Sequence, residues 1–125
     1  MPSTNYALGY TCLLFALVVH MAKADPVYHA ASLALLCISI VRHWAAQVTP
    51  AIAWTDRLVA HACYLLAAHT HLVQHPNAPG AACLATVLAL WVSEHRVADW
   101  ALLHAPMHAV AAAGLALAVH RRSLG

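Results

Sequence analysis

The sequence predicts an all-α protein, a polytopic transmembrane helical bundle of about five helices, formed as a single domain by residues 1–125. Hydrophobic residues make up 63% of the chain and charged residues only 8%, and the mean hydropathy is +0.71. Soluble domains carry about a quarter charged residues, because a small body has a large surface to solvate. Proline and polar residues divide this apolar chain into five segments. We therefore expect an integral membrane protein that crosses the bilayer several times.

Breaks in the apolar sequence define the first two expected helices. Residues 6–21 form the first apolar segment, which is followed by a Lys-Ala-Asp-Pro turn at 23–26. Residues 27–44 form the second, which ends before Thr49 and Pro50. A helix needs roughly 20 residues to cross the hydrocarbon and about 17 can suffice, so both segments are close to the required length.

The other three expected helices, at residues 51–72, 81–95 and 100–119, are bounded in the same way. A run with two prolines and a glycine at 75–80 separates the third from the fourth, and the polar turn around Arg96 separates the fourth from the fifth. The fourth is the shortest and reaches a crossing length only with its interfacial ends. We expect helices throughout because unpaired backbone groups are costly in lipid.

Five crossings assign each segment end to one of two membrane faces. Four tryptophans from separate segment ends then fall on the face that holds the N-terminus, namely Trp44, Trp54, Trp91 and Trp100. Because tryptophan prefers the headgroup region, this belt supports the number of crossings. Lysine and arginine are shared between the two faces, so the positive-inside rule gives no orientation.

The same alternation brings five polar residues to one depth near the tryptophan face. Ser39 and His43 lie near the end of the second segment, Asp56 lies near the start of the third, and His104 and His108 lie near the start of the fifth. Such groups cost free energy at membrane depth unless they are paired, so they indicate a functional site. Three helices would supply its side chains.

The spacing of the histidines predicts a metal centre. Residues four apart project from one face of a helix, so His104 and His108 can bind one ion, with His43 as the third ligand. Three neutral imidazoles and a water form an open Zn²⁺ coordination sphere, in which the pKa of the water falls to about 7. Asp56 would orient the water or accept its proton, and Ser39 would hold Asp56 or polarise a substrate carbonyl.

This pattern resembles the CREST superfamily of membrane hydrolases, which includes the alkaline ceramidases, the PAQR receptors and the GPI-anchor remodelling enzymes. The matching motifs are Ser39-x3-His43, Asp56 within Ala-Trp-Thr-Asp-Arg, and His104-x3-His108. The resemblance implies that the three histidines bind zinc, that Asp56 and Ser39 complete the catalytic site, and that the substrate is a lipid amide or ester. Family members typically have a seven-helix core, so a five-helix chain would be a minimal member.

Three other interpretations stay open. The total of 11 histidines also suggests a metal transporter or sensor. The five polar residues could instead form a hydrogen-bonded patch that holds three helices together, with Asp56 and Arg57 as an interfacial charge pair. A membrane haem protein would use two axial imidazoles near the face opposite the tryptophans. The histidines available there are His20, His29, His69 and His120.

The remaining features bound the function. A net charge of +2, with no basic run longer than two arginines, argues against nucleic-acid binding. We interpret the four cysteines, one in each of the first four segments, as small buried hydrophobic residues. His71 and His75 are expected at the interface or in a solvated loop, and Glu94 and Asp99 are expected to cap or flank the last turn. Whether the chain forms a homo-oligomer stays open.

Overall fold

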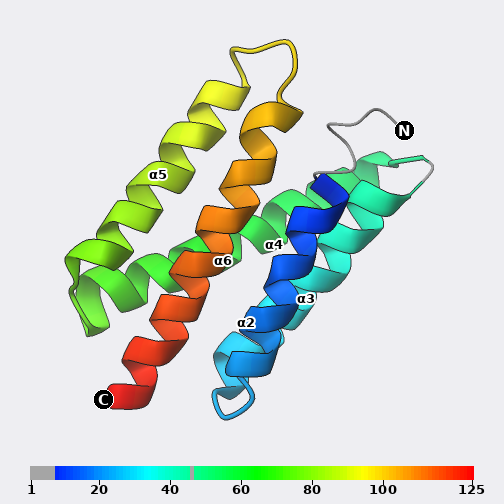
Figure 1. The fold of residues 1–125 in the computed structure, drawn as a ribbon. Coiled ribbons are helices and arrows are strands. Elements are labelled where there is room, and N and C mark those ends of the chain that lie inside the picture. The colour runs from blue at the N-terminus through cyan, green and yellow to red at the C-terminus, as the bar shows by residue number, and fades with distance from the viewer. Residues whose placement is uncertain (1–7, 46) are drawn as a thin grey trace.

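The computed structural model describes residues 8–45 and 47–125, and these residues form helices and connecting turns without any strand. The described residues include five α-helices, α2 to α6, which short turns connect (Figure 1). A 3₁₀ turn, η1 (Cys12–Leu14), leads into the first of them, and a π-helical turn, η2 (Thr70–Gln74), continues the third. The α-helices are α2 (Phe15–Met21), α3 (Pro26–Trp44), α4 (Pro50–His69), α5 (Ala78–Glu94) and α6 (Ala101–Leu124).

Three helices begin at the turns that the sequence indicates. The side chains of Asp25, Thr49 and Asn77 accept hydrogen bonds from backbone N–H groups in the first turns of α3, α4 and α5. In each case a proline occupies one of the first two helical positions, where its fixed φ suits the helix and its missing N–H has no intrahelical partner to lose.

The observed helix bounds differ from the expected ones by three residues or more at three places. The helix expected to begin at residue 81 begins at Ala78. The helix expected at 100–119 continues to Leu124, and the helix expected to end at residue 72 gives way to the π turn after His69. At the amino end of the first expected helix, residues 6 and 7 lie outside the described residues.

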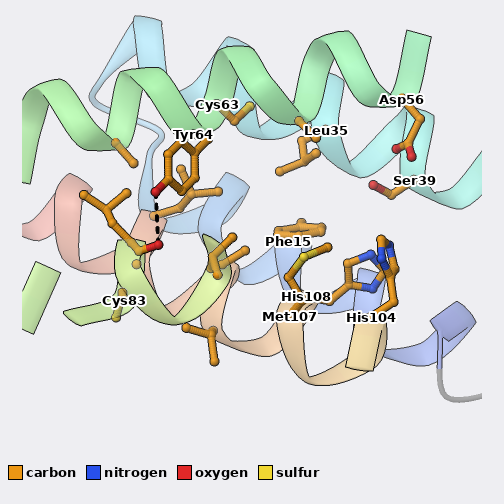
Figure 2. Close-up of a pocket in the computed structure, with 18 residues that line it drawn as sticks. Phe15, Leu35, Ser39, Asp56, Cys63, Tyr64, Cys83, His104, Met107 and His108 are labelled. Atoms are coloured by element: carbon orange, nitrogen blue, oxygen red, sulfur yellow. Dashed lines mark hydrogen bonds between the residues drawn. The ribbon is translucent and has the colours of Figure 1, made fainter. Parts of the chain in front are cut away.

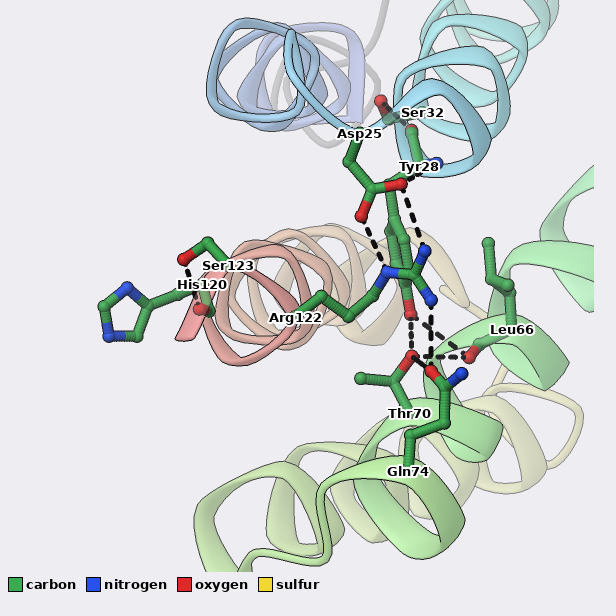
Figure 3. Close-up of polar contacts among 9 residues, drawn as sticks. All are labelled: Asp25, Tyr28, Ser32, Leu66, Thr70, Gln74, His120, Arg122 and Ser123. Atoms are coloured by element: carbon green, nitrogen blue, oxygen red, sulfur yellow. Dashed lines mark hydrogen bonds and ion pairs between the residues drawn. The ribbon is translucent and has the colours of Figure 1, made fainter. Parts of the chain in front are cut away.

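A polar cluster at the end of α6 accounts for its greater length (Figure 3). Arg122 donates to Asp25 through Nε, at 2.6 Å from Oδ2, and through Nη1 to the side-chain oxygen of Gln74 at 3.1 Å. Its guanidinium also lies 5.2 Å from the centre of the Tyr28 ring. The arginine is therefore bound within the protein, and it ties the end of α6 to α3 and η2.

The helices pack as two layers that meet along α6. In Figure 1, α6 runs beside α5 on one side and near α2 on the other, with α4 crossing obliquely behind it. α3 packs mainly against α2 and α4, whereas α4 makes few contacts with α5 and α6. The shared core includes Phe15, Tyr28, Leu35, Cys63 and Leu115. The sparse contact of α4 with α5 and α6 leaves space for two cavities, both of which reach the candidate site.

Two helices, α3 and α6, are long and apolar enough to cross a membrane. α5 and the helical stretch Leu8–Met21 are apolar but shorter. The four tryptophans of the expected belt lie at the end of the bundle where α3 and α5 finish and α4 and α6 begin (Figure 1), and each is between 38% and 60% exposed.

Candidate metal centre

Three histidines meet between the end of α3 and the start of α6. His43 lies in the last turn of α3, and His104 and His108 lie in the first turns of α6. One ligand nitrogen from each can be chosen so that all three lie within 4.8 Å of one another. The ring centres of His104 and His108 are 4.6 Å apart, and that of His43 lies 5.0 Å from His108. The predicted convergence of the three imidazoles is confirmed, and together they are suited to hold a metal ion.

A carboxylate orients His104. Oε2 of Glu94, at the end of α5, lies 2.9 Å from Nδ1 of His104, and Glu94 is buried. An ionised carboxylate can only accept, so Nδ1 carries the proton and Nε2 keeps its lone pair for a metal. This arrangement of carboxylate, imidazole and metal position is the usual one around metal-binding histidines.

A hydroxyl orients His108 in the same sense. Oγ1 of Thr11 lies 3.1 Å from Nδ1 of His108, and the Thr11 hydroxyl donates to the carbonyl oxygen of Leu8 at 3.3 Å. This contact holds the ring through Nδ1. With the proton on Nδ1, the Nε2 lone pair of His108 is available for a ligand bond.

His43 supplies an independent indication that an ion fits this place. Its Nε2 is buried and has no hydrogen-bond partner within the described residues. A buried ring nitrogen without a partner costs free energy, and a metal ion is one group that would satisfy it. Together with the Nδ1 contacts of the other two rings, this leaves one nitrogen of each imidazole without a hydrogen bond within the described residues.

Ser39 and Asp56 lie near the histidines, and within the described residues no hydrogen bond joins either of them to an imidazole. Both are buried, and both line a cavity of about 110 Å³ together with His104 and His108. Figure 2 shows the two oxygen-bearing side chains on one side of this cavity and the imidazoles on the other. Within the described residues, no hydrogen bond joins Ser39 to Asp56. The two residues share a cavity, and their catalytic roles stay predictions.

The ion pair of Asp56 differs from the charge pair that the sequence suggests. Asp56 pairs with Arg42, whose Nη1 lies 3.3 Å from Oδ2, whereas the Arg57 guanidinium lies 5.4 Å from the centre of the Trp54 ring. Arg42 is in the last turn of α3, one residue before His43, so it links Asp56 to the helix that carries a histidine ligand.

The cavity continues from the polar site into the apolar core. Its other walls include Leu35, Cys63, Tyr64, Cys83 and Leu115. Figure 2 shows the Tyr64 hydroxyl, which donates to the carbonyl oxygen of Leu84 at 3.0 Å and joins α4 to α5 across the far end. A polar centre at the head of an apolar pocket can place a reactive carbonyl or similar group while it holds an apolar chain.

Two interpretations of single residues are wrong. His71 is fully buried rather than solvated, and its Nε2 bonds the carbonyl oxygen of Gly114 at 2.8 Å. Of the four cysteines, Cys37 is exposed and Cys83 is only partly buried, while Cys12 and Cys63 are buried. Exposed apolar surface is acceptable on a face that meets lipid.

Glu94, Thr11 and Arg42 are the site residues that sequence reasoning missed. Glu94 was expected to cap or flank a turn, but it is buried against His104. A carboxylate within an apolar chain with only four acidic residues is the signal that could have pointed to it. Thr11 carries no comparable signal, because its partner lies 97 residues further along the chain.

The histidines of the haem interpretation are mostly at the surface. His20, His69 and His120 are exposed, and Nδ1 of His29 lies 3.1 Å from the carbonyl oxygen of Val19. Within the described residues, the only cluster of three potential metal ligands is the one formed by His43, His104 and His108.

No family model, curated protein or solved structure matches this chain. The resemblance to the CREST superfamily therefore rests on the motifs given above and on nothing beyond them.

Proposed function

We propose that this chain is an integral, multi-pass membrane protein that uses zinc to hydrolyse a lipid amide or ester. The observation that carries the proposal is the set of three buried or half-buried imidazoles, two of them oriented through Nδ1 and the third with an unpartnered Nε2. Two of them, His104 and His108, line a cavity that is also lined by the Asp56 carboxylate and the Ser39 hydroxyl.

Zinc is the metal that this donor set favours. Three histidines with room for a further ligand is the arrangement of catalytic zinc sites, which keep one coordination position open, and imidazole nitrogen suits zinc better than magnesium or calcium. When bound, zinc supplies Lewis acidity, which polarises a carbonyl group and makes water reactive near neutral pH.

The protein's own residues would carry the remaining steps. Asp56 is placed to accept a proton from the attacking water and to return it to the leaving group. Arg42 holds the Asp56 carboxylate from the side of α3. The Ser39 hydroxyl is a donor for the substrate carbonyl oxygen. The apolar part of the cavity would exclude water from the bound chain.

The outer surface supports a membrane location with several crossings. Large apolar side chains are more than 60% exposed on α2, α4 and α6, namely Leu17, Leu58, Leu65 and Leu102. In the apolar 18-residue stretch of each helix, only 28% of α3 and 39% of α6 is buried within the protein. A soluble monomer rarely exposes so much apolar surface, whereas lipid would cover it. Substrate would then reach the site from within the bilayer.

The ordered motifs add to this proposal. The CREST-type pattern assigns zinc to His43, His104 and His108 and catalytic roles to Asp56 and Ser39. In support, the three histidines lie close enough to share an ion, and Asp56 and Ser39 line a cavity with two of them. With five helices in place of the usual seven, the chain would be a minimal version of such an enzyme.

Metal content tests the centre. We expect about one zinc per chain in the purified protein and a loss of most of it in His104→Ala and in His108→Ala, measured by elemental analysis. His120→Ala is the matched control, because His120 is exposed near the far end of α6. Undiminished zinc in both site variants would exclude this centre.

Turnover tests the chemistry separately. Asp56→Asn should retain zinc and lose at least a hundredfold in the hydrolysis of acyl amides and esters presented in micelles, because general base catalysis contributes about 10²–10⁴-fold. A variant that keeps full activity would remove Asp56 from the mechanism. A wild-type protein that binds zinc and hydrolyses none of these compounds would favour a transporter or sensor.

A further inference from the structure

A second and wider cavity opens from the candidate site between α4 and α5. Its volume is about 650 Å³, and it reaches Asp56 and His104 at its inner end. Leu65, Val87 and Leu88 line its apolar part. Because it shares Asp56 and His104 with the narrow cavity, a ligand in the groove can extend directly to the histidines.

Both carboxylates of this groove are already engaged. Asp56 is paired with Arg42 at 3.3 Å, and Glu94 bonds Nδ1 of His104 at 2.9 Å. The groove also contains Arg57, His61 and His95. Asp56 is used by Arg42 and Glu94 by His104, so no described carboxylate forms an ion pair with Arg57.

Arg42 retains donors for a ligand. Its contacts with Asp56 and with the carbonyl oxygen of Ala53, at 3.3 and 3.4 Å, both use Nη1. A guanidinium has five N–H donors in a fixed fork, and neither Nε nor Nη2 of Arg42 has a hydrogen bond among the described contacts. Neither nitrogen is fully buried without a partner. Both can therefore be reached by a ligand in the groove.

Arg57 is the second available cation. It has no ion pair with any described carboxylate, and its guanidinium rests 5.4 Å from the Trp54 ring centre. Trp91 and Trp100 line the same groove, and aromatic rings with a polar edge suit the boundary between an apolar chain and a hydrated headgroup. The groove thus offers two arginines from neighbouring helices above an apolar wall.

We propose that Arg42 and Arg57 form an anion subsite beside the histidines, and that the ligand of this site is an acyl amphiphile with an acidic headgroup. This inference rests on the proposed hydrolase function and specifies its substrate class. Arginine binds carboxylate and phosphate through paired hydrogen bonds, so either group satisfies the subsite. A neutral headgroup would leave Arg57 without an anionic partner and the remaining donors of Arg42 unused.

Binding of matched amphiphiles tests the subsite. The probes are N-oleoylglycine against N-oleoylethanolamine for a carboxylate, and oleoyl-lysophosphatidate against monoolein for a phosphate. Affinities are measured with the full chain in neutral phosphatidylcholine nanodiscs, after treatment with a chelator so that no probe is turned over. We expect the acidic member to bind at least fivefold more tightly in one or both pairs, and the pair that shows the preference identifies the headgroup.

Variants of Arg57 assign the preference to this groove. Arg57→Gln should weaken binding of the acidic probe by about fivefold, as expected for the loss of one partly exposed ion pair, and leave the neutral probe unchanged. Arg57→Lys should retain most of the preference. Arg96→Gln is the matched control, since Arg96 is an exposed arginine in the turn before α6 that does not line the groove.

Three outcomes would overturn the subsite. These are equal binding of acidic and neutral probes in both pairs, a preference that Arg57→Gln leaves intact, and an equal effect of Arg96→Gln. Acidic probes that bind through Arg57 but are not hydrolysed by the zinc-loaded protein would support the subsite while contradicting the hydrolase function, so the two proposals fail separately.

Discussion

Glu94 fixes the orientation of one predicted ligand through a single contact. Its carboxylate is buried at the end of α5 and bonds Nδ1 of His104 at 2.9 Å. Glu94→Gln keeps an acceptor of similar shape but removes the charge, so the imidazole becomes a poorer donor to a metal. We expect the zinc affinity to fall by about tenfold, the lower end of the range for such partners, in a competition titration with a chromophoric chelator.

Asp99→Asn is the control for Glu94→Gln, because Asp99 is an exposed carboxylate in the same turn. It should leave the affinity unchanged. If Glu94→Gln binds zinc as tightly as the wild type, the contact has no role in presenting the metal ligand.

At the scale of single residues, the sequence predicted the three histidine ligands but not the residues that contact their rings. His104 and His108 are related by helical spacing, and the alternating direction of successive helices relates them to His43, so all three follow from the order of segments in the sequence. The contacts of Glu94 and Thr11 with these rings join different helices. They depend on how the helices rotate and pack, which one sequence does not specify.

At the scale of elements, Gly80 allows α5 to pack against the π turn. A Cβ at Gly80 would overlap the ring of His71, which is buried in η2 and bonds the carbonyl oxygen of Gly114 in α6. Gly80→Ala should therefore displace this ring and destabilise the fold by about 1–3 kcal/mol. Thermal unfolding in detergent measures the effect, and Ala85→Ser at an exposed position of the same helix should have almost none.

The ion pair between Asp25 and Arg122 makes the stability of the fold depend on pH in the acidic range. The hydrogen bond with Arg122 holds the pKa of Asp25 below its ordinary value. The contribution of the pair is thus fully present above the unfolded-chain pKa of about 3.9, and it is lost as the pH falls through the lower pKa of the folded state. Asp25→Asn keeps a capping oxygen for α3 but removes the ion pair.

We expect Asp25→Asn to be about 1 kcal/mol less stable than the wild type at neutral pH, as for a well-formed but partly exposed pair. The difference should shrink below about pH 4, which thermal unfolding over a pH series can measure. A difference that stays constant over the whole series would show that the ion pair contributes nothing and that the effect comes from helix capping alone.

Helix bounds that depend on local signals were easier to predict than bounds that depend on distant contacts. A capping residue with a proline at one of the next two positions is a local signal, and α3, α4 and α5 begin in this way. The end of α6 depends instead on the distant Asp25 and Gln74, which bind Arg122 and allow the helix to continue past the expected interface. The π turn likewise follows from contacts of His71 and Thr70 with other helices.

At the scale of the whole molecule, five crossings would place the two ends of the described bundle on opposite sides of a membrane. Reporter tags placed beside Met1 and Gly125 should therefore differ in their accessibility to protease in sealed vesicles. The protein should also stay with the membrane after alkaline carbonate extraction. Tags that are protected together, or release by carbonate, would contradict the proposed topology.

The overall arrangement was predictable to the extent that composition and alternation determine it. An apolar chain with five segments gives five helices whose ends alternate, and this places the tryptophans at one end of the bundle. The oblique crossing of α4, and hence the groove between α4 and α5, was not predictable. It follows from the close packing of α3 on α4 and of α5 on α6, with little contact between the two pairs.

The position of the histidine ligands along the chain has a consequence for biosynthesis. Two of the three lie in α6, which is synthesised after α2 to α5, and the residues that orient them come from just before η1 and from the end of α5. A nascent chain therefore cannot assemble the three-histidine centre until α6 has been made and packed. Ion capture would report that α6 has docked against α3 and α5, and a chain truncated before α6 would lack the ability to bind the metal at this place.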